Sequence, residues 1–218
     1  MTFDVLTLFP EMFEGFKTSS IIGRAIKNNL IEVNTHLLRN WAWNNYGAVD
    51  DRPYGGGPGM VIRADVIDRA LSDLKREGAK VILTSAKGKT WSQAKAEKMM
   101  KEERIIIIAG HYEGVDQRVA DKLVDEEISI GNYVLTGGEL AAMVMVDSVS
   151  RLIPGVLGKD DSSRDESFST QNDGGKVKRM KEYPQYTRPA QYFGIKVPEE
   201  LLSGDPKIIE AWKLKNRR

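Results

Sequence analysis

Short apolar runs and helical periodicities alternate along the first two thirds of the chain. Alternating apolar and polar side chains, or continuous apolar runs, predict strands at residues 3–9, 32–38, 80–84 and 104–109. Apolar residues at helical spacing predict helices at residues 21–29, 64–77, 92–101, 117–123 and 141–149. The run at 104–109 is typical of a parallel strand buried on both faces. Strands that alternate with helices in this way predict an α/β domain with a mostly parallel sheet.

The stretch 128–149 begins with β-prone residues and glycines and ends with apolar residues at helical spacing. This pattern predicts a glycine turn that leads onto a buried helix. Gly137 and Gly138 leave backbone amides uncovered by side chains, and the start of a helix directs further free N–H groups outward. The turn is therefore either part of a ligand site or only a tight connection between a strand and a helix.

Three glycine-bearing segments follow predicted strands, at residues 84–88, 110–114 and 131–138. Because ligands of parallel sheets gather outside the carboxyl ends of the strands, we expect the three segments to converge on one binding site. None carries the spaced glycines of a dinucleotide site. Gly88-Lys89-Thr90 imitates a phosphate-binding loop, but Leu83 stands where that loop needs its first glycine, which excludes a nucleoside triphosphatase of this type.

Residues 50–60 have an unusual composition, with four glycines and two prolines within eight residues. Such a segment forms neither a helix nor a central strand, and ordering so much backbone freedom is costly without a partner. A contact with a ligand or a second subunit is one interpretation, and a plain surface loop is the other.

The end of the chain differs from the rest in composition. Residues 159–176 are almost all polar, charged or glycine, which predicts a mobile linker between a domain at 1–158 and a small helical domain at 177–218. Short helices are expected at 198–202 and 206–215. From Lys176 onward, eleven basic residues stand against five acidic ones. This basic surface either contacts phosphates or is simply solvated.

The overall composition narrows the chemistry. The chain of 218 residues carries 32 basic and 31 acidic residues, so any surface for nucleic acid must come from local segregation of charge. Without cysteine and with only two histidines, disulfides, thiolate chemistry and common zinc sites are excluded. No apolar run approaches the roughly 18 residues that span a bilayer, so we expect no membrane association and a cytoplasmic location.

Six stretches together resemble the bacterial tRNA (guanine-N1)-methyltransferases of the TrmD type, in the SPOUT superfamily. In chain order they are Thr7 to Pro10, Asp50 to Met60, Gly110 to Gly114, Ser129 to Leu140, Arg151 to Gly158 and Tyr186 to Pro189. The resemblance covers essentially the whole chain. It implies a deep trefoil knot in the central domain, an exception to the rule against threaded chains, and an obligate homodimer with composite active sites.

The family binds S-adenosylmethionine in a bent conformation among the knot loops. The resemblance therefore implies cofactor contacts from Thr84, Ser85, Gly88, Gly110, Tyr112, Glu113, Gly114, Ser129, Ile130, Gly131, Tyr133, Leu135, Gly137 and Gly138. Glu113 is expected to compensate the cofactor's ammonium group or to help hold a magnesium ion, with helix capping as the alternative role. No metal site built from protein ligands alone is expected.

The resemblance also implies the catalytic residues. Arg151 corresponds to the arginine that stabilises negative charge growing on guanine O6, and the family's general base is a linker aspartate fifteen residues later. Glu166 occupies that position here and Asp165 precedes it, so the sequence departs from the family pattern. Glu166 is the favoured base and Asp165 the alternative.

The implied substrate is the guanosine at tRNA position 37, just 3′ of the anticodon. Because N1 is reached only when the base leaves its stack, the basic C-terminal domain is expected to grip the anticodon stem-loop while the linker orders over the base. Two alternatives remain open. The chain is a SPOUT methyltransferase for another RNA base, or it is a tRNA-binding module that has lost turnover.

Overall fold

The computed structural model describes residues 1–74, 77–158, 167–168, 170–173, 176–179 and 181–217. The chain divides into two compact units, Met1–Gly158 and Lys159–Arg218. Within the described ranges, every helix is too short or too polar to cross a lipid bilayer.

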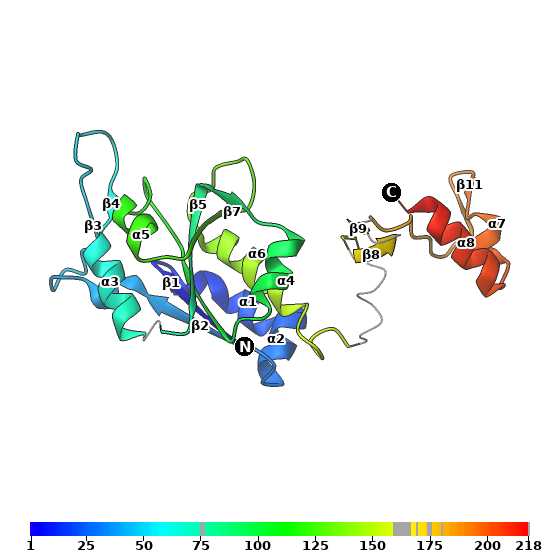
Figure 1. Ribbon diagram of the computed structural model, residues 1–218, viewed down its shortest axis with the longest axis horizontal. Coiled ribbons are helices and arrows are strands. Elements are labelled where there is room, and N and C mark those ends of the chain that lie inside the picture. The colour runs from blue at the N-terminus through cyan, green and yellow to red at the C-terminus, as the bar shows by residue number, and fades with distance from the viewer. Residues whose placement is uncertain (75–76, 159–166, 169, 174–175, 180, 218) are drawn as a thin grey trace. The chain divides into compact units, whose positions relative to one another are not determined.

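A five-stranded sheet forms the centre of the first unit (Figure 1). Its strands lie in the order β2-β1-β6-β5-β7, and all four neighbouring pairs are parallel. The strand bounds are β1 (Thr2–Thr7), β2 (Glu32–Leu37), β5 (Lys80–Thr90), β6 (Arg104–Ile108) and β7 (Glu126–Ser129). The α/β prediction with a mostly parallel sheet is confirmed.

Helices cover both faces of this sheet, as expected when each parallel strand is followed by a crossover connection. The α-helices are α1 (Glu14–Thr18), α2 (Ser20–Lys27), α3 (Ala64–Asp73), α4 (Gln93–Met99), α5 (Gln117–Lys122) and α6 (Glu139–Ser150). Two 3₁₀ helices, η1 (Pro10–Phe13) and η2 (Leu38–Trp41), and a short antiparallel pair, β3 (Asp50–Asp51) with β4 (Val61–Ile62), complete the unit.

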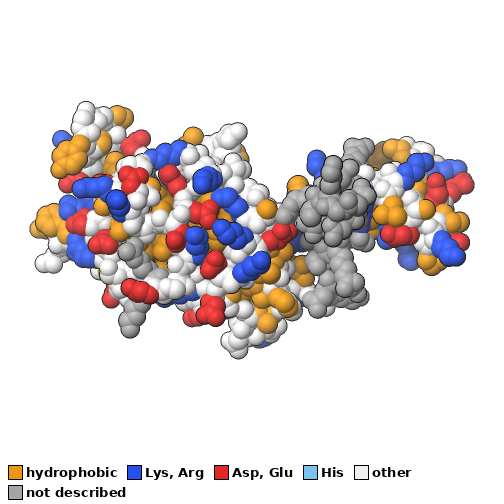
Figure 2. Space-filling model, viewed as in Figure 1, with side chains coloured by type: hydrophobic (Ala, Val, Ile, Leu, Met, Phe, Trp, Pro, Cys, Tyr) orange, Lys and Arg blue, Asp and Glu red, His pale blue; other side chains and the backbone are white. Residues whose placement is uncertain are grey.

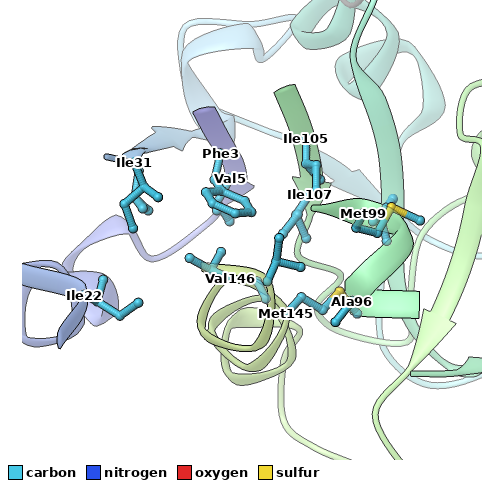
Figure 3. Packing of buried hydrophobic residues seen from close by; sticks show 14 of the residues in the cluster. Phe3, Val5, Ile22, Ile31, Ala96, Met99, Ile105, Ile107, Met145 and Val146 are labelled. Carbon is cyan, nitrogen blue, oxygen red and sulfur yellow. The ribbon is translucent and has the colours of Figure 1, made fainter. Parts of the chain in front are cut away.

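Alternate side chains of the central strands enter two separate cores, because successive residues of a strand point to opposite faces. Phe3 and Val5 of β1 and Ile105 and Ile107 of β6 pack with α2, α4 and α6 on one face (Figure 3). Leu6 of β1 and Ile106 and Ile108 of β6 face the other side with α3 and α5. The continuous apolar run in β6 is therefore explained by burial on both faces.

β5 extends further than the sequence predicts, to Thr90 instead of Thr84. Its pairing with β7 shifts register between Thr84 and Lys89, so the strand bulges at residues 85–88 and then continues beside β7. Gly88 permits this, since a Cβ there would lie 2.5 Å from the backbone nitrogen of Ile128. The Gly88-Lys89-Thr90 sequence thus belongs to a strand and not to a phosphate-binding loop.

Several element ends also differ from the predicted ranges. α2 begins at Ser20 and ends at Lys27, and α3 ends at Asp73 instead of residue 77. The predicted cap of α4 is confirmed, because the Ser92 side chain accepts a hydrogen bond from the backbone N–H of Lys95. α6 spans Glu139–Ser150, so it begins two residues earlier and ends one residue later than predicted.

The second unit contains two short helices, α7 (Glu199–Leu202) and α8 (Pro206–Asn216), close to the predicted ranges. It also contains two antiparallel pairs that the sequence does not predict, β8 (Thr170–Asp173) with β9 (Lys176–Arg179) and β10 (Gln191–Tyr192) with β11 (Ile195–Lys196). β8 lies within the stretch expected to be a linker without regular structure. Trp212 of α8 packs edge-on against Tyr183 and Tyr186 and gathers the unit's small aromatic cluster.

Charged side chains of both signs are mixed over the viewed faces of the molecule (Figure 2). This mixture agrees with the near balance of 32 basic and 31 acidic residues. Unlike these surface charges, Asp4 of β1 is buried, at 2% exposure. It accepts hydrogen bonds from His36 Nε2 and Arg104 Nε at 2.7 Å each, which tie β1 to both of its neighbouring strands.

Candidate functional site

A cavity of about 380 Å³ lies between the bulge of β5 and the loops that follow β6 and β7. The three glycine-bearing segments predicted from the sequence all line it. The predicted residues in the lining are Thr84, Ser85, Gly110, Tyr112, Glu113, Gly114, Ser129, Ile130, Gly131, Tyr133, Leu135, Gly137 and Gly138. Gly88 is not among them, because it lies against the backbone of β7. The expected convergence of the three segments is therefore observed, as the carboxyl-end rule for parallel strands requires.

The floor of the cavity is a close contact between backbone segments. The Gly138 N–H donates to the Gly110 carbonyl at 2.7 Å. Thr84 Oγ1 donates to the Ile108 carbonyl and accepts from the Gly110 N–H, both at 3.1 Å. A Cβ on Gly138 would lie 2.7 Å from the Gly110 nitrogen and would collide with Thr84 Oγ1. The absence of a side chain at Gly138 is thus a steric requirement.

The segment 129–135 forms the opposite wall. Ser129 Oγ donates to the Gly131 carbonyl at 2.9 Å and accepts from the Gly131 N–H at 3.2 Å, which holds the turn after β7. The Tyr133 hydroxyl donates to the Ile130 carbonyl at 3.3 Å. Tyr133 and Leu135 remain exposed at the cavity, where they offer apolar surface to a ligand.

Glu113 lies at the junction between the cavity and the glycine-rich segment 50–60. Its backbone N–H donates to the Met60 carbonyl at 3.0 Å, and a Cβ on Gly59 would approach its Oε1 within 2.5 Å. Tyr112, just before it, has a left-handed backbone with φ of 57° and accepts a hydrogen bond from Arg39 Nη2 at 3.4 Å. The carboxylate of Glu113 is exposed, so it is free to meet a cation in the cavity.

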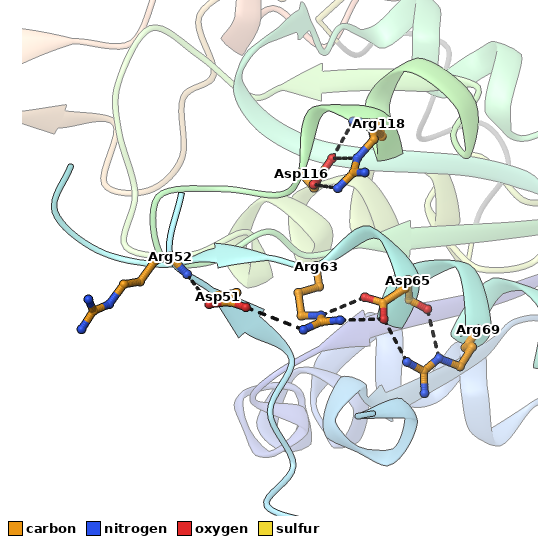
Figure 4. Close-up of polar contacts among 7 residues, drawn as sticks. All are labelled: Asp51, Arg52, Arg63, Asp65, Arg69, Asp116 and Arg118. Atoms are coloured by element: carbon orange, nitrogen blue, oxygen red, sulfur yellow. Dashed lines mark hydrogen bonds and ion pairs between the residues drawn. The ribbon is translucent and has the colours of Figure 1, made fainter. Parts of the chain in front are cut away.

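Ion pairs fix the base of the glycine-rich segment (Figure 4). Arg63, directly after β4, donates to both oxygens of Asp65 at 2.9 Å and lies 3.7 Å from Asp51. The hydrogen bond from Arg63, with a further one from Arg69, lowers the pKa of Asp65 to about 2. Within the segment, the side chain of Tyr54 is fully exposed.

Of the predicted catalytic residues, the structure describes Arg151 alone. Arg151 follows the last residue of α6 on the surface, and its backbone N–H donates to the Asp147 carbonyl at 3.1 Å. It is not among the cavity-lining residues. Asp165 and Glu166 lie outside the described residues. The first described residue after them is Ser167, whose N–H donates to Glu182 Oε1 at 2.9 Å.

A buried polar group beneath the cavity was missed by sequence reasoning. Glu139 is 2% exposed, and its Oε1 accepts a hydrogen bond of 2.8 Å from the Thr7 hydroxyl. Its Oε2 lies 3.8 Å from Nδ1 of His111, a cavity-lining residue. The available signal was an acidic residue directly before an apolar helix, but a helix N-terminus ordinarily attracts such a residue for its dipole.

The chemistry of the lining suits a polar, cationic small molecule of nucleoside type. Backbone amides and carbonyls, small side chains and aromatic rings offer hydrogen bonds and stacking to an adenosine, and Glu113 offers one negative charge. Among the described residues there is no group of three or more His, Asp or Glu side chains placed to hold a metal. The site therefore fits S-adenosylmethionine, whose amino acid end carries an ammonium group.

Comparison with known proteins gives one consistent result. A protein-family model described as tRNA (Guanine-1)-methyltransferase TrmD matches residues 1–218. A "tRNA (guanine-N(1)-)-methyltransferase" of Geobacter sp. (strain M21) is 50% identical over 219 residues, covering 100% of this chain and 85% of the relative. Proteins with the same description are 51% identical in Ruminiclostridium cellulolyticum and 49% identical in Staphylococcus aureus (strain MRSA252). Those two alignments cover 98% of this chain and 90% and 84% of the relatives.

Proposed function

The chain belongs to the tRNA (guanine-1)-methyltransferase TrmD family, and we propose that it methylates N1 of the guanosine at tRNA position 37, using S-adenosylmethionine. The observation that carries the proposal is the single cavity lined by all three glycine-bearing segments, in a chain that matches the family from end to end. Its relatives at about 50% identity are described as enzymes for this class of reaction.

The cofactor is proposed to bind in the 380 Å³ cavity. When bound, it supplies an electrophilic methyl group on a sulfonium. The adenine edge would be read by backbone groups of the two loops at 110–114 and 131–138 that internal hydrogen bonds leave available. Glu113 would compensate the ammonium group, and it is also the described residue best placed to contribute to a magnesium ion shared with the substrate.

Transfer to N1 requires removal of the N1 proton and stabilisation of the charge that grows on O6. We assign proton removal to Glu166, with Asp165 as the alternative, and charge stabilisation to the guanidinium of Arg151. A glutamate is longer than an aspartate by one methylene, so the linker must place its backbone further from the base. Because Arg151 lies outside the cavity lining, it is proposed to act only when the substrate base and the linker assemble beside the cofactor.

The family's trefoil knot and homodimer are part of the proposal. The close backbone contact between Gly138 and Gly110 supports the knot, because a threaded chain has to pass close to the segment after β6. Leu140 and Val144, one turn apart on α6, are 51% and 44% exposed although both are apolar. An apolar helix face of this kind supports packing against a second copy, whose linker would complete each active site.

The second unit is proposed to bind the anticodon stem-loop. Its basic residues outnumber its acidic ones. Lys213 Nζ lies 5.1 Å from the ring centroid of Tyr183, so a positive charge stands beside the aromatic cluster. Basic side chains of this kind would bind the phosphates of the tRNA without distinguishing its base sequence. The base would be selected at the cavity, after it leaves the stack.

The test is methyl transfer from labelled S-adenosylmethionine to unmodified leucine or proline tRNA in the presence of magnesium, followed by identification of the nucleoside. We expect 1-methylguanosine, with loss of activity in Arg151→Ala and Glu166→Ala. Asp160→Ala, which removes another carboxylate of the same linker, serves as the matched control. A different methylated base would establish the alternative RNA target, and binding of cofactor and tRNA without methyl transfer would establish the non-catalytic alternative.

Composite active sites have their own test. Mixed dimers of Arg151→Ala and Glu166→Ala subunits would recover one intact site if the two residues act across the interface. Activity in proportion to the fraction of mixed dimers is expected. Complete inactivity at every mixing ratio would place both residues in the same subunit's site and would contradict this part of the proposal.

A further inference from the structure

Glu139 is a buried carboxylate that no step of the proposed reaction uses. It is the first residue of α6, at 2% exposure, and it adjoins the apolar core between α6 and the sheet. A buried charge is costly unless hydrogen bonds or ion pairs compensate it. The position of Glu139 at a helix N-terminus compensates only part of this cost, so its side-chain partners matter.

The two oxygens of Glu139 face two different segments of the chain. Oε1 accepts from the Thr7 hydroxyl at the end of β1, at 2.8 Å. The same hydroxyl oxygen accepts from the Phe9 N–H at 2.9 Å, so its proton is committed to Glu139. Oε2 lies 3.8 Å from His111 Nδ1 in the loop after β6. Within the described residues, this buried Nδ1 has no hydrogen-bond partner.

The surroundings hold the His111 ring in this position. It packs against Phe9 at a centroid distance of 5.0 Å and edge-on against Tyr112 at 5.2 Å. Gly137 pairs with His111 through an isolated antiparallel bridge. A Cβ on Gly137 would lie 2.5 Å from His111 Nδ1 and would collide with Glu139 Oε2. The glycine therefore leaves room for the histidine and the glutamate to approach each other.

From this geometry we infer that Glu139 is a positioning residue. Its contacts hold the loop at 110–114 and the loop at 131–138 against the end of β1, which we call its fastening role. Thr7 and His111 are its two partners. Both loops line the cavity, so fastening them keeps the cavity in the shape that binds the cofactor. The apparent affinity of a ligand falls in proportion to the fraction of molecules in the competent shape. The identity of that ligand rests on the proposed function.

The test measures binding of S-adenosylhomocysteine by titration calorimetry, because this demethylated form of the cofactor gives an affinity without turnover. Glu139→Gln removes the charge with little change in shape, and His111→Phe keeps an aromatic ring but removes the nitrogen. We expect each to weaken binding about threefold to tenfold, because each removes the 3.8 Å approach of Glu139 Oε2 to His111 Nδ1. The double variant should bind no more weakly than the weaker single variant, because both changes break the same contact. Glu14→Gln, the same change at an exposed position, is the control.

Additive losses in the double variant would overturn the inference, since they would mean that His111 contacts the ligand independently of Glu139. Unchanged affinity in both single variants would overturn it as well. If Glu139→Gln does not fold, Thr7→Val and His111→Phe decide the question, because both leave the carboxylate in place. Wild-type affinity in these two variants would refute the inference.

A second readout needs no ligand and separates this inference from the proposed function. Hydrogen exchange of the free protein should become faster at residues 110–114 and 131–138 in Glu139→Gln, while exchange in β2 stays unchanged. If the wild-type protein forms no 1-methylguanosine but the loops respond in this way, the proposed function fails and the fastening role stands. Unchanged exchange at both loops would refute the fastening role whatever the enzyme's activity.

Discussion

Replacing Gly138 by alanine is the sharpest test of how the cavity is built. With φ of −85° and ψ of −4°, the backbone at Gly138 accepts an alanine, so the expected loss is steric. The new Cβ would lie 2.7 Å from the Gly110 nitrogen and 2.9 Å from the Ala109 Cα, which are backbone atoms and cannot rotate away. The two segments must separate, and the 2.7 Å hydrogen bond from the Gly138 N–H to the Gly110 carbonyl lengthens or breaks.

The expected loss of stability is the sum of three contributions. Overpacking costs about 1–3 kcal/mol and a lost hydrogen bond about 0.5–1.5 kcal/mol, against a gain of about 0.4–1 kcal/mol from the less flexible unfolded chain. Taken at the middle of these ranges, the net destabilisation is about 2 kcal/mol, which lowers Tm by about 4–8 °C for a unit of this size. Because the displaced segments form the cavity floor, the affinity for S-adenosylhomocysteine should also fall by about tenfold or more.

Gly15→Ala is the matched control for this prediction. Gly15 lies in α1, and a Cβ there meets no atom within 4 Å. Alanine should therefore stabilise the protein by about 0.5–1 kcal/mol through helix propensity, without changing the affinity. Thermal unfolding and calorimetric titration of both variants provide the comparison. Equal shifts of Tm in the two variants, or wild-type affinity in Gly138→Ala, would refute the steric reasoning.

Three further predictions concern the sheet, its pH response and the assembly. Asp4→Asn should lower the free energy of unfolding by about 2–3 kcal/mol in denaturant titrations, because it weakens two buried hydrogen bonds. The control Asp51→Asn, at an exposed ion pair, should lower it by less than about 0.5 kcal/mol. Burial raises the pKa of Asp4, but the hydrogen bonds from His36 and Arg104 outweigh burial and hold this pKa below its ordinary 3.8. The ionised Asp4 therefore contributes its full stabilisation above pH 3.8 and loses it as the pH falls through the lower pKa of the folded state. Wild type and Asp4→Asn should accordingly converge in stability in acid. Leu140→Asp should shift a dimer to a monomer in light scattering if α6 packs against a second copy, while Glu14→Gln should leave the mass unchanged; an unchanged mass for Leu140→Asp would argue against this interface.

Local periodicity determined much of the fold. The alternating and continuous apolar runs of β1 and β6 predicted their strands and their burial, because side-chain direction within a strand depends only on position along it. The parallel sheet and the convergence of the glycine-bearing segments followed from the order of strands and helices. The rejection of a phosphate-binding loop at Gly88 also holds, although its true environment inside β5 was not predicted.

Contacts between distant segments decided the rest. The sequence marked Gly138 as a turn residue, but its steric role depends on Gly110 and Thr84 lying against it. β5 continues to Thr90 because β7 lies beside it and accepts the register shift, which no local propensity encodes. The short strands β10 and β11 likewise depend on pairing with each other.

The buried group beneath the cavity illustrates the same division most clearly. In the sequence, Glu139 is an acidic residue at the start of a helix and His111 is a residue after a strand, 28 positions earlier. Neither position indicates a partner. Only the tertiary structure brings His111 Nδ1 and Glu139 Oε2 to within 3.8 Å and buries the Nδ1 atom and the carboxylate. Burial gives the contact its importance, because an uncompensated charge is costly only where water is excluded. The sequence by itself determined which segments form the site, and packing between those segments determined how the site is held.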